Sequence, residues 1–138
     1  MQTFLPYRDF KQSAICLDKK RQFKQVVEAS QIYNTLIHKR KAWQNHPAVL
    51  MWKGYEDALA EYHNVCWEVA KEKWGIKFVK LSKIAMGDVV IYPPWLGNEK
   101  FHASHRSNLL RKNIEYYSQF GWTEPPNLEY FWPTKEGY

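Results

Sequence analysis

The stretch from Leu17 to His38 constrains the fold most, because it contains no glycine or proline and carries one apolar stripe at helical spacing. Asp18 stands near its start and is a good N-cap residue, so a long helix is predicted to begin there. An apolar stripe of this kind is expected to face a protein core. Its members are Val26, Ala29, Ser30, Tyr33, Leu36 and Ile37.

A polar stripe follows the same predicted helix and contains a single acid, Glu28. At steps of three and four residues the stripe comprises Arg21, Lys24, Glu28, Gln31 and Thr35. A lone carboxylate among cations on a core helix is a candidate acid/base group. The alternative is a solvated i,i+4 pair between Lys24 and Glu28, which spacing alone favours.

Two further main helices and one short helix are predicted from the remaining patterns. The short helix spans 10–16. The second main helix spans 48–73, with Asn45 as a candidate cap, Pro47 in its first turn and Gly75 at its end. Its apolar stripe again has helical spacing, and its other face is charged and balanced.

The third main helix is predicted over 98–120 and is ended by Gly121. Its expected core positions are Phe101, Leu109, Leu110, Ile114 and Tyr117. For residues 76–92 the pattern allows a short strand, part of a helix or an extended chain. The tail is predicted to be irregular and packed over the body, with Trp122, Tyr130, Phe131, Trp132 and Tyr138 as its aromatic residues. The sum is a mostly α, compact single domain over 1–138 with three main helices and aromatic-rich loops.

The net charge of +6 is distributed unevenly along the chain. Residues 1–44 hold nine Lys/Arg against three Asp/Glu, and residues 98–113 hold four against one. If the fold brings these segments together, they form one positive face suited to a polyanion. Cys16 and Cys66 are predicted to be buried thiols, and no membrane span or signal-peptide core is found, so a cytoplasmic location is expected.

The start of the third main helix concentrates donor side chains that can share one face, namely His102, His105, Arg106 and Lys112. Donors near a helix N-terminus suit phosphate groups. A metal site is disfavoured because no carboxylate or cysteine accompanies the two histidines at ligand spacing, and no cofactor is predicted. The alternative is a capped helix start with a solvated basic face.

Amines are the nucleophiles that remain, because the chain has no GxSxG motif, no Gly-rich phosphate loop and no Cys/His arrangement at known spacing. Lys24 lies one turn from Glu28. The α-amine of the chain lies at the end of a short arm, and α-amines ordinarily have a pKa near 8, well below that of lysine. A neutral amine can attack a sugar C1′ and form a Schiff base.

Five blocks of this sequence point to a known family: MQTFLPYRDF, LDKKRQFKQVVEA, NHPAVLMW, PPWLGNEKFHASHRSNLLRK and LEYFWP. In them the chain resembles the pyrimidine-dimer DNA glycosylase family, also called the endonuclease V family, and most closely its bacterial and phage members. The resemblance implies a compact helical, monomeric enzyme that kinks damaged double-stranded DNA and flips a base. It implies glycosylase and AP-lyase activity at ultraviolet lesions, in a bacterial or phage-infected cell.

The resemblance also implies roles for individual residues. In the family the N-terminal α-amine attacks C1′ and a glutamate on the first long helix assists; Glu28 matches that glutamate. The residues it implies for DNA binding are Arg21, Lys24, Gln25, His102, His105, Arg106, Arg111, Lys112, Tyr116 and Tyr117. Trp122 belongs to the same aromatic cluster as the two tyrosines.

Two departures from the family pattern leave the nucleophile open. Gln2 is a poor context for removal of the initiator methionine, so the reactive amine belongs to Met1, or to Gln2 if processing occurs. A terminal Gln2 could also cyclise and lose its amine. Val27, rather than an arginine, precedes Glu28, and Lys24 is the substitute Schiff-base candidate. The alternative functions are a glycosylase for another modified base, a non-enzymatic nucleic-acid-binding protein and a helical interaction domain.

Overall fold

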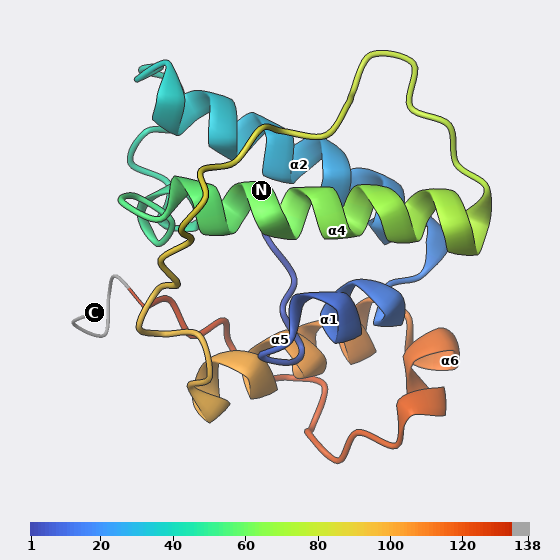
Figure 1. Ribbon diagram of the computed structural model, residues 1–138. Helices are drawn as coiled ribbons and strands as arrows, with labels where there is room; N and C mark the ends of the chain where they lie inside the picture. Colours follow the sequence, from blue (N-terminus) through green and yellow to red (C-terminus); the bar gives the residue numbers. More distant parts are fainter. Residues whose placement is uncertain (134–138) are drawn as a thin grey trace.

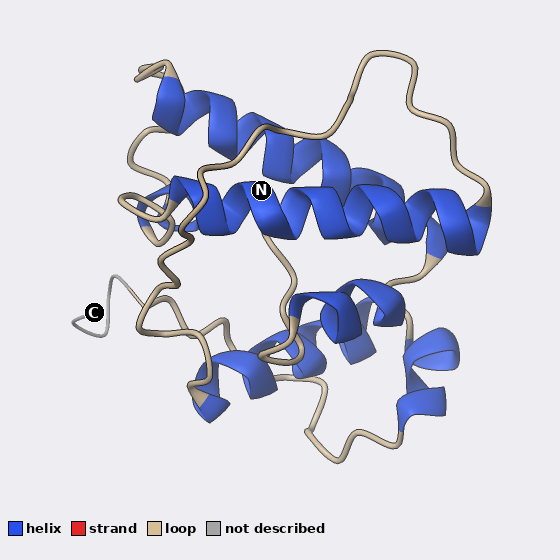
Figure 2. Cartoon of the chain, viewed as in Figure 1, coloured by secondary structure: helices blue, strands red, loops and turns tan. Residues whose placement is uncertain are grey.

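Two long antiparallel helices, α2 (Lys19–Ile37) and α4 (Glu56–Trp74), lie side by side and form one layer of the molecule (Figure 1). A second group, α1 (Phe10–Cys16), α5 (Glu99–Lys112) and α6 (Ile114–Tyr117), lies against it. This computed structural model describes residues 1–133, and within that range all regular structure is helical (Figure 2). The predicted mostly α fold is therefore confirmed. None of the described helices is long and apolar enough to cross a membrane.

Helix α2 begins where the sequence predicts, but Asp18 does not cap it by a side-chain hydrogen bond. Its carboxylate instead accepts from the Tyr117 hydroxyl at 2.5 Å and from Arg21 Nη1 at 3.0 Å. Asp18 thus ties the start of α2 to α6. The apolar stripe faces the core at Val26 and Ala29, whereas Ile37 at the helix end is 47% exposed, contrary to the prediction.

The prediction of one continuous helix over 48–73 is wrong, because the chain is interrupted there. A short α3 (Pro47–Leu50) is followed by a turn, and the long α4 starts at Glu56. Gly54 in that turn has φ +89°, a conformation that cannot continue an α-helix. His46, rather than Asn45, caps α3: its Nδ1 accepts from the Ala48 N–H at 3.0 Å. Gly75 ends α4 in the left-handed conformation, as predicted.

The predicted third main helix also divides into shorter elements. Asn113 leaves the helical conformation after α5 and caps α6 by accepting from the Tyr116 N–H at 3.2 Å. A short 3₁₀ helix, Ser118–Phe120, follows and Gly121 ends it. Ile114 is 54% exposed and is not the core residue predicted. Residues 76–97 form a long irregular connection, so the segment 76–92 contains neither a strand nor a helix.

The aromatic residues mainly build the core and fasten the tail. The Trp52 and Trp95 rings meet edge to face with their centroids 5.0 Å apart, and the ring centroids of Trp95 and Phe101 are 4.8 Å apart. Tyr130 packs against a small apolar cluster, as predicted for the tail. This cluster consists of Phe4, Leu17, Leu109, Leu110 and Tyr117. Tyr138 lies outside the described residues.

Candidate active site

The first eight residues form an arm, here called the N-terminal arm, that runs between the two helical groups (Figure 1). Gln2 to Pro6 are buried. A buried backbone needs partners for its polar groups, and side chains of α2, α4 and α5 supply them. Gln25 accepts from the Phe4 N–H at 2.6 Å and donates to the Gln2 carbonyl at 2.9 Å. These bonds hold the backbone of Gln2 and Phe4 in a defined position beside α2.

Helix α5 binds the arm with three of the side chains that were predicted to bind phosphate. His105 Nδ1 accepts from the Leu5 N–H at 2.9 Å, and His102 Nδ1 lies 2.7 Å from the Leu5 carbonyl. Arg106 donates to the Pro6 carbonyl at 2.7 Å and pairs with Glu124 at 3.0 Å.

All three of these α5 side chains are at least 90% buried. These three side chains were predicted to form a basic face that binds phosphate. That prediction is wrong for them, because the N-terminal arm covers this face of α5. Gln25 and Tyr117 are buried as well, and Tyr116 lies against Lys73 at 3.0 Å. Of the predicted DNA-binding set, these six residues hold the fold together in this structure.

The free energy of unfolding is expected to fall as the pH drops from about 6.5 toward 3, because burial lowers the pKa of His105 to about 3. Between those values the unfolded chain binds a proton that the folded chain excludes, so each pH unit costs about 1.4 kcal/mol. Urea unfolding at several pH values measures this slope. His105→Asn keeps an acceptor for the Leu5 N–H without titrating in this range. Equal slopes for the wild type and this variant would contradict the assignment.

Glu28 lies at the free end of the arm. The Gln2 N–H donates to its Oε2 at 3.1 Å, across 26 residues of sequence. Met1 and Glu28 together line two neighbouring cavities of about 580 and 480 Å³. We call the first the amine cavity and the second the tryptophan cavity, since Trp43 lines it. Glu28 is half-buried, and its contact with Gln2 replaces the solvated Lys24–Glu28 pair that spacing favoured.

Cations from both basic segments surround the amine cavity. Lys20, Arg21 and Lys24 reach it from α2, and Lys112 reaches it from the end of α5. Burial and the neighbouring charges of Arg21, Arg111 and Lys24 lower the pKa of Lys112. The fold thus brings the two basic segments together, which is what one shared positive face requires. Such a concentration of positive charge suits a phosphodiester backbone.

His46 is a residue of this site that sequence reasoning missed. Its ring lines the amine cavity between α2 and α3. Burial and the charged α-amine lower its pKa, while Glu28 acts in the opposite direction. With Nδ1 engaged as the α3 cap, the neutral ring carries its proton on Nε2. The HP dipeptide ahead of a helix signals such a cap, but nothing in the spacing connects it with Glu28.

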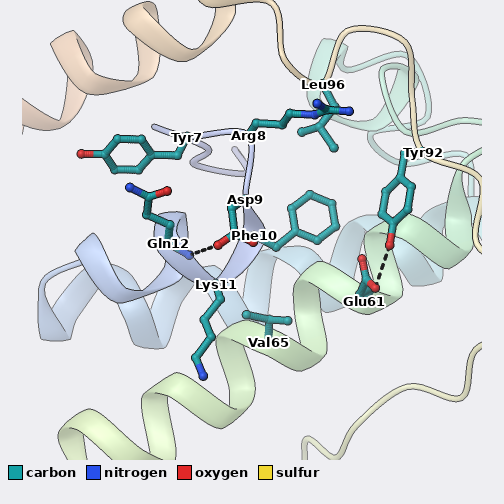
Figure 3. Close-up of a pocket in the computed structure, with 10 residues that line it drawn as sticks. All are labelled: Tyr7, Arg8, Asp9, Phe10, Lys11, Gln12, Glu61, Val65, Tyr92 and Leu96. Atoms are coloured by element: carbon teal, nitrogen blue, oxygen red, sulfur yellow. Dashed lines mark hydrogen bonds between the residues drawn. The ribbon is translucent and has the colours of Figure 1, made fainter.

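A separate cavity of about 620 Å³ lies beside α1 (Figure 3). Its acids are engaged: Asp9 caps α1 through the Gln12 N–H at 3.2 Å, and Glu61 accepts from the Tyr92 hydroxyl at 2.9 Å. The terminal amine and Glu28 do not line it. Among the described residues, no group of three or more His, Cys, Asp and Glu side chains could hold a metal ion.

Comparison with known proteins yields one family. The sequence model described as pyrimidine dimer DNA glycosylase matches residues 1–80, more than half of the 138-residue chain. The matched part contains the N-terminal arm, α1 to α4 and therefore Met1, Glu28 and His46. No curated protein and no solved structure shows significant similarity.

Proposed function

The chain belongs to the pyrimidine dimer DNA glycosylase family, and from this premise we propose that its terminal amine and Glu28 together excise the damaged base and then cleave the strand. The substrate is double-stranded DNA that carries a pyrimidine dimer and is kinked on binding. A single observation carries the proposal: the Gln2 N–H bonds Glu28 at 3.1 Å, beside a cavity lined by cations of two helices.

The proposed chemistry begins with attack of the neutral α-amine on C1′ of the damaged nucleotide. As the N–C1′ bond forms, the glycosidic bond breaks, and the base takes up a proton while it stays joined to the other pyrimidine of the dimer. The sugar ring opens when O4′ leaves C1′ with a second proton, giving an imine. Loss of a C2′ proton then expels the 3′-phosphate by β-elimination. Glu28 stabilises the positive charge that develops at C1′ and transfers protons in these steps.

Borohydride trapping tests this proposal, because it reduces the imine to a stable secondary amine. The protein is incubated with dimer-containing, undamaged and abasic-site duplexes, and any adduct is mapped by peptide mass. An adduct at Met1 or Gln2 on the dimer duplex supports the proposal and identifies which residue is the terminus. An adduct with abasic DNA alone would leave a lyase of another base specificity. Binding without any adduct would favour a non-enzymatic DNA-binding protein.

Replacing Lys112 by Met is expected to weaken binding to all duplexes alike and to lower the salt dependence of binding. Each phosphate contact contributes about 0.9 to the slope of log K against log salt, so the slope should become smaller by about that amount. Fluorescence anisotropy at several salt concentrations measures this slope. Lys100→Met is the matched control, since Lys100 is exposed on the same helix about three turns away. An unchanged slope for Lys112→Met would remove Lys112 from the DNA interface.

A further inference from the structure

The connection between α2 and α3 carries an unusual combination of charge, exposure and backbone conformation. It begins with three consecutive cations, Lys39, Arg40 and Lys41. Trp43 follows and is 60% exposed. Lys39 at φ +49° and Trp43 at φ +67° are the non-glycine residues of 1–133 with positive φ.

The conformation of Trp43 is disfavoured for a residue with a bulky side chain, and core packing does not explain it. The turn holds the backbone, because the Trp43 carbonyl accepts from the His46 N–H at 2.9 Å. The indole meets the His46 ring edge to face at 5.9 Å. The turn therefore presents a large apolar ring to solvent, and such backbone outliers concentrate at functional sites.

The position of this ring links it to the candidate active site. Trp43 and Arg40 line the tryptophan cavity together with Met1 and Glu28. Its neighbour His46 lines the amine cavity, which is also lined by Met1 and Glu28. The exposed indole thus borders the point where the proposed nucleophile and the acid meet.

We propose that Trp43 inserts into the base stack at the lesion and occupies the space of the displaced nucleotide. Enzymes that act on a base must take it out of the stack, and apolar side chains inserted between base steps keep DNA kinked. The bicyclic indole is comparable in size to a purine. Lys39, Arg40 and Lys41 would contact phosphates beside the insertion, where the charge of the loop is greatest. This inference rests on the proposed function.

The test compares two reactions that differ in their need for base displacement. Single-turnover excision is measured on a dimer duplex, and strand cleavage is measured on a duplex with a preformed abasic site. Trp43→Ala is expected to slow excision by about 30-fold, the value of one lost stacking contact, with a much smaller loss on the abasic duplex. Trp43→Phe should retain an intermediate rate.

Phe23→Ala is the control for loss of an exposed ring. Phe23 is 47% exposed on α2, but it stacks on Phe78 at 5.6 Å and lines neither the amine cavity nor the tryptophan cavity. This variant should excise at the wild-type rate. Thermal unfolding of each variant separates a local effect from a loss of fold.

A second measurement reports base unstacking directly. A 2-aminopurine beside the dimer should brighten when saturating wild-type protein unstacks it, and should stay dim with Trp43→Ala. The insertion would be overturned if Trp43→Ala excised the dimer at the wild-type rate and brightened 2-aminopurine as the wild type does. It would also be overturned if this variant lost the same factor in rate on the dimer and abasic duplexes. Both results would leave the glycosylase assignment intact. A wild-type protein that does not excise dimers would instead overturn the proposed function, and this inference with it.

Discussion

Replacing Glu28 by Gln is expected to slow base release from dimer-containing DNA by about a thousandfold, a typical loss when an acid/base group is removed. Glutamine has nearly the same shape, and its amide oxygen can still accept from the Gln2 N–H that now bonds Glu28 at 3.1 Å. The variant therefore keeps the position of the arm and loses the negative charge and the proton-transferring oxygen. Affinity for the duplex should remain within a few-fold, because the cations around the amine cavity are unchanged.

Single-turnover excision and binding are measured side by side for this variant. Glu72→Gln, an exposed carboxylate on α4, is the matched control for a change of one charge. Glu28→Asp, which keeps the charge and shortens the side chain, should retain more activity than Glu28→Gln. Full turnover by Glu28→Gln would show that Glu28 is not the assisting acid.

Extending the N-terminus by two residues is expected to reduce covalent trapping by about a thousandfold or more, because the reactive amine no longer lies beside Glu28. The buried part of the arm, Gln2 to Pro6, can keep its place, since Met1 is only half-buried at the cavity. The fold and the cation-lined surface should then be preserved. The extended protein is expected to bind duplex DNA as the wild type does.

Lys24→Met on the unextended chain separates the two candidate nucleophiles. If the α-amine attacks C1′, this variant still forms the borohydride adduct, while the extended protein does not. The reverse pattern, with the adduct of the extended protein mapped to Lys24, would keep the chemistry and move the nucleophile to α2. Acetylation of the terminus removes the same amine without added residues, so it should also abolish the adduct if the α-amine is the nucleophile.

Several features of this protein follow from local sequence patterns. Helix α1 has the predicted bounds Phe10–Cys16, and the left-handed glycines Gly75 and Gly121 end the elements before them. These features depend on a few neighbouring residues, since caps, turns and helical periodicity act over one or two turns. Glu28 could be singled out for the same reason, as the lone acid on one helical face.

Local patterns did not show where the second and third main helices break. Gly54 lies within a helical pattern that can tolerate one glycine, and Asn113 occupies an ordinary polar position of the other pattern. In the folded protein Trp52, in the turn before α4, is fully buried, and Tyr117, after the break at Asn113, donates to the Asp18 carboxylate. Propensity is a weak preference, and burial of large aromatic side chains overrides it.

The composition of the site was decided by tertiary structure. Spacing placed His102, His105 and Arg106 on one face of a helix, but it could not show that the N-terminal arm covers that face. It likewise could not bring His46 and Trp43 to Met1 and Glu28. A helical repeat determines which side chains share a face, whereas the identity of the neighbour on that face depends on contacts between residues far apart in the chain.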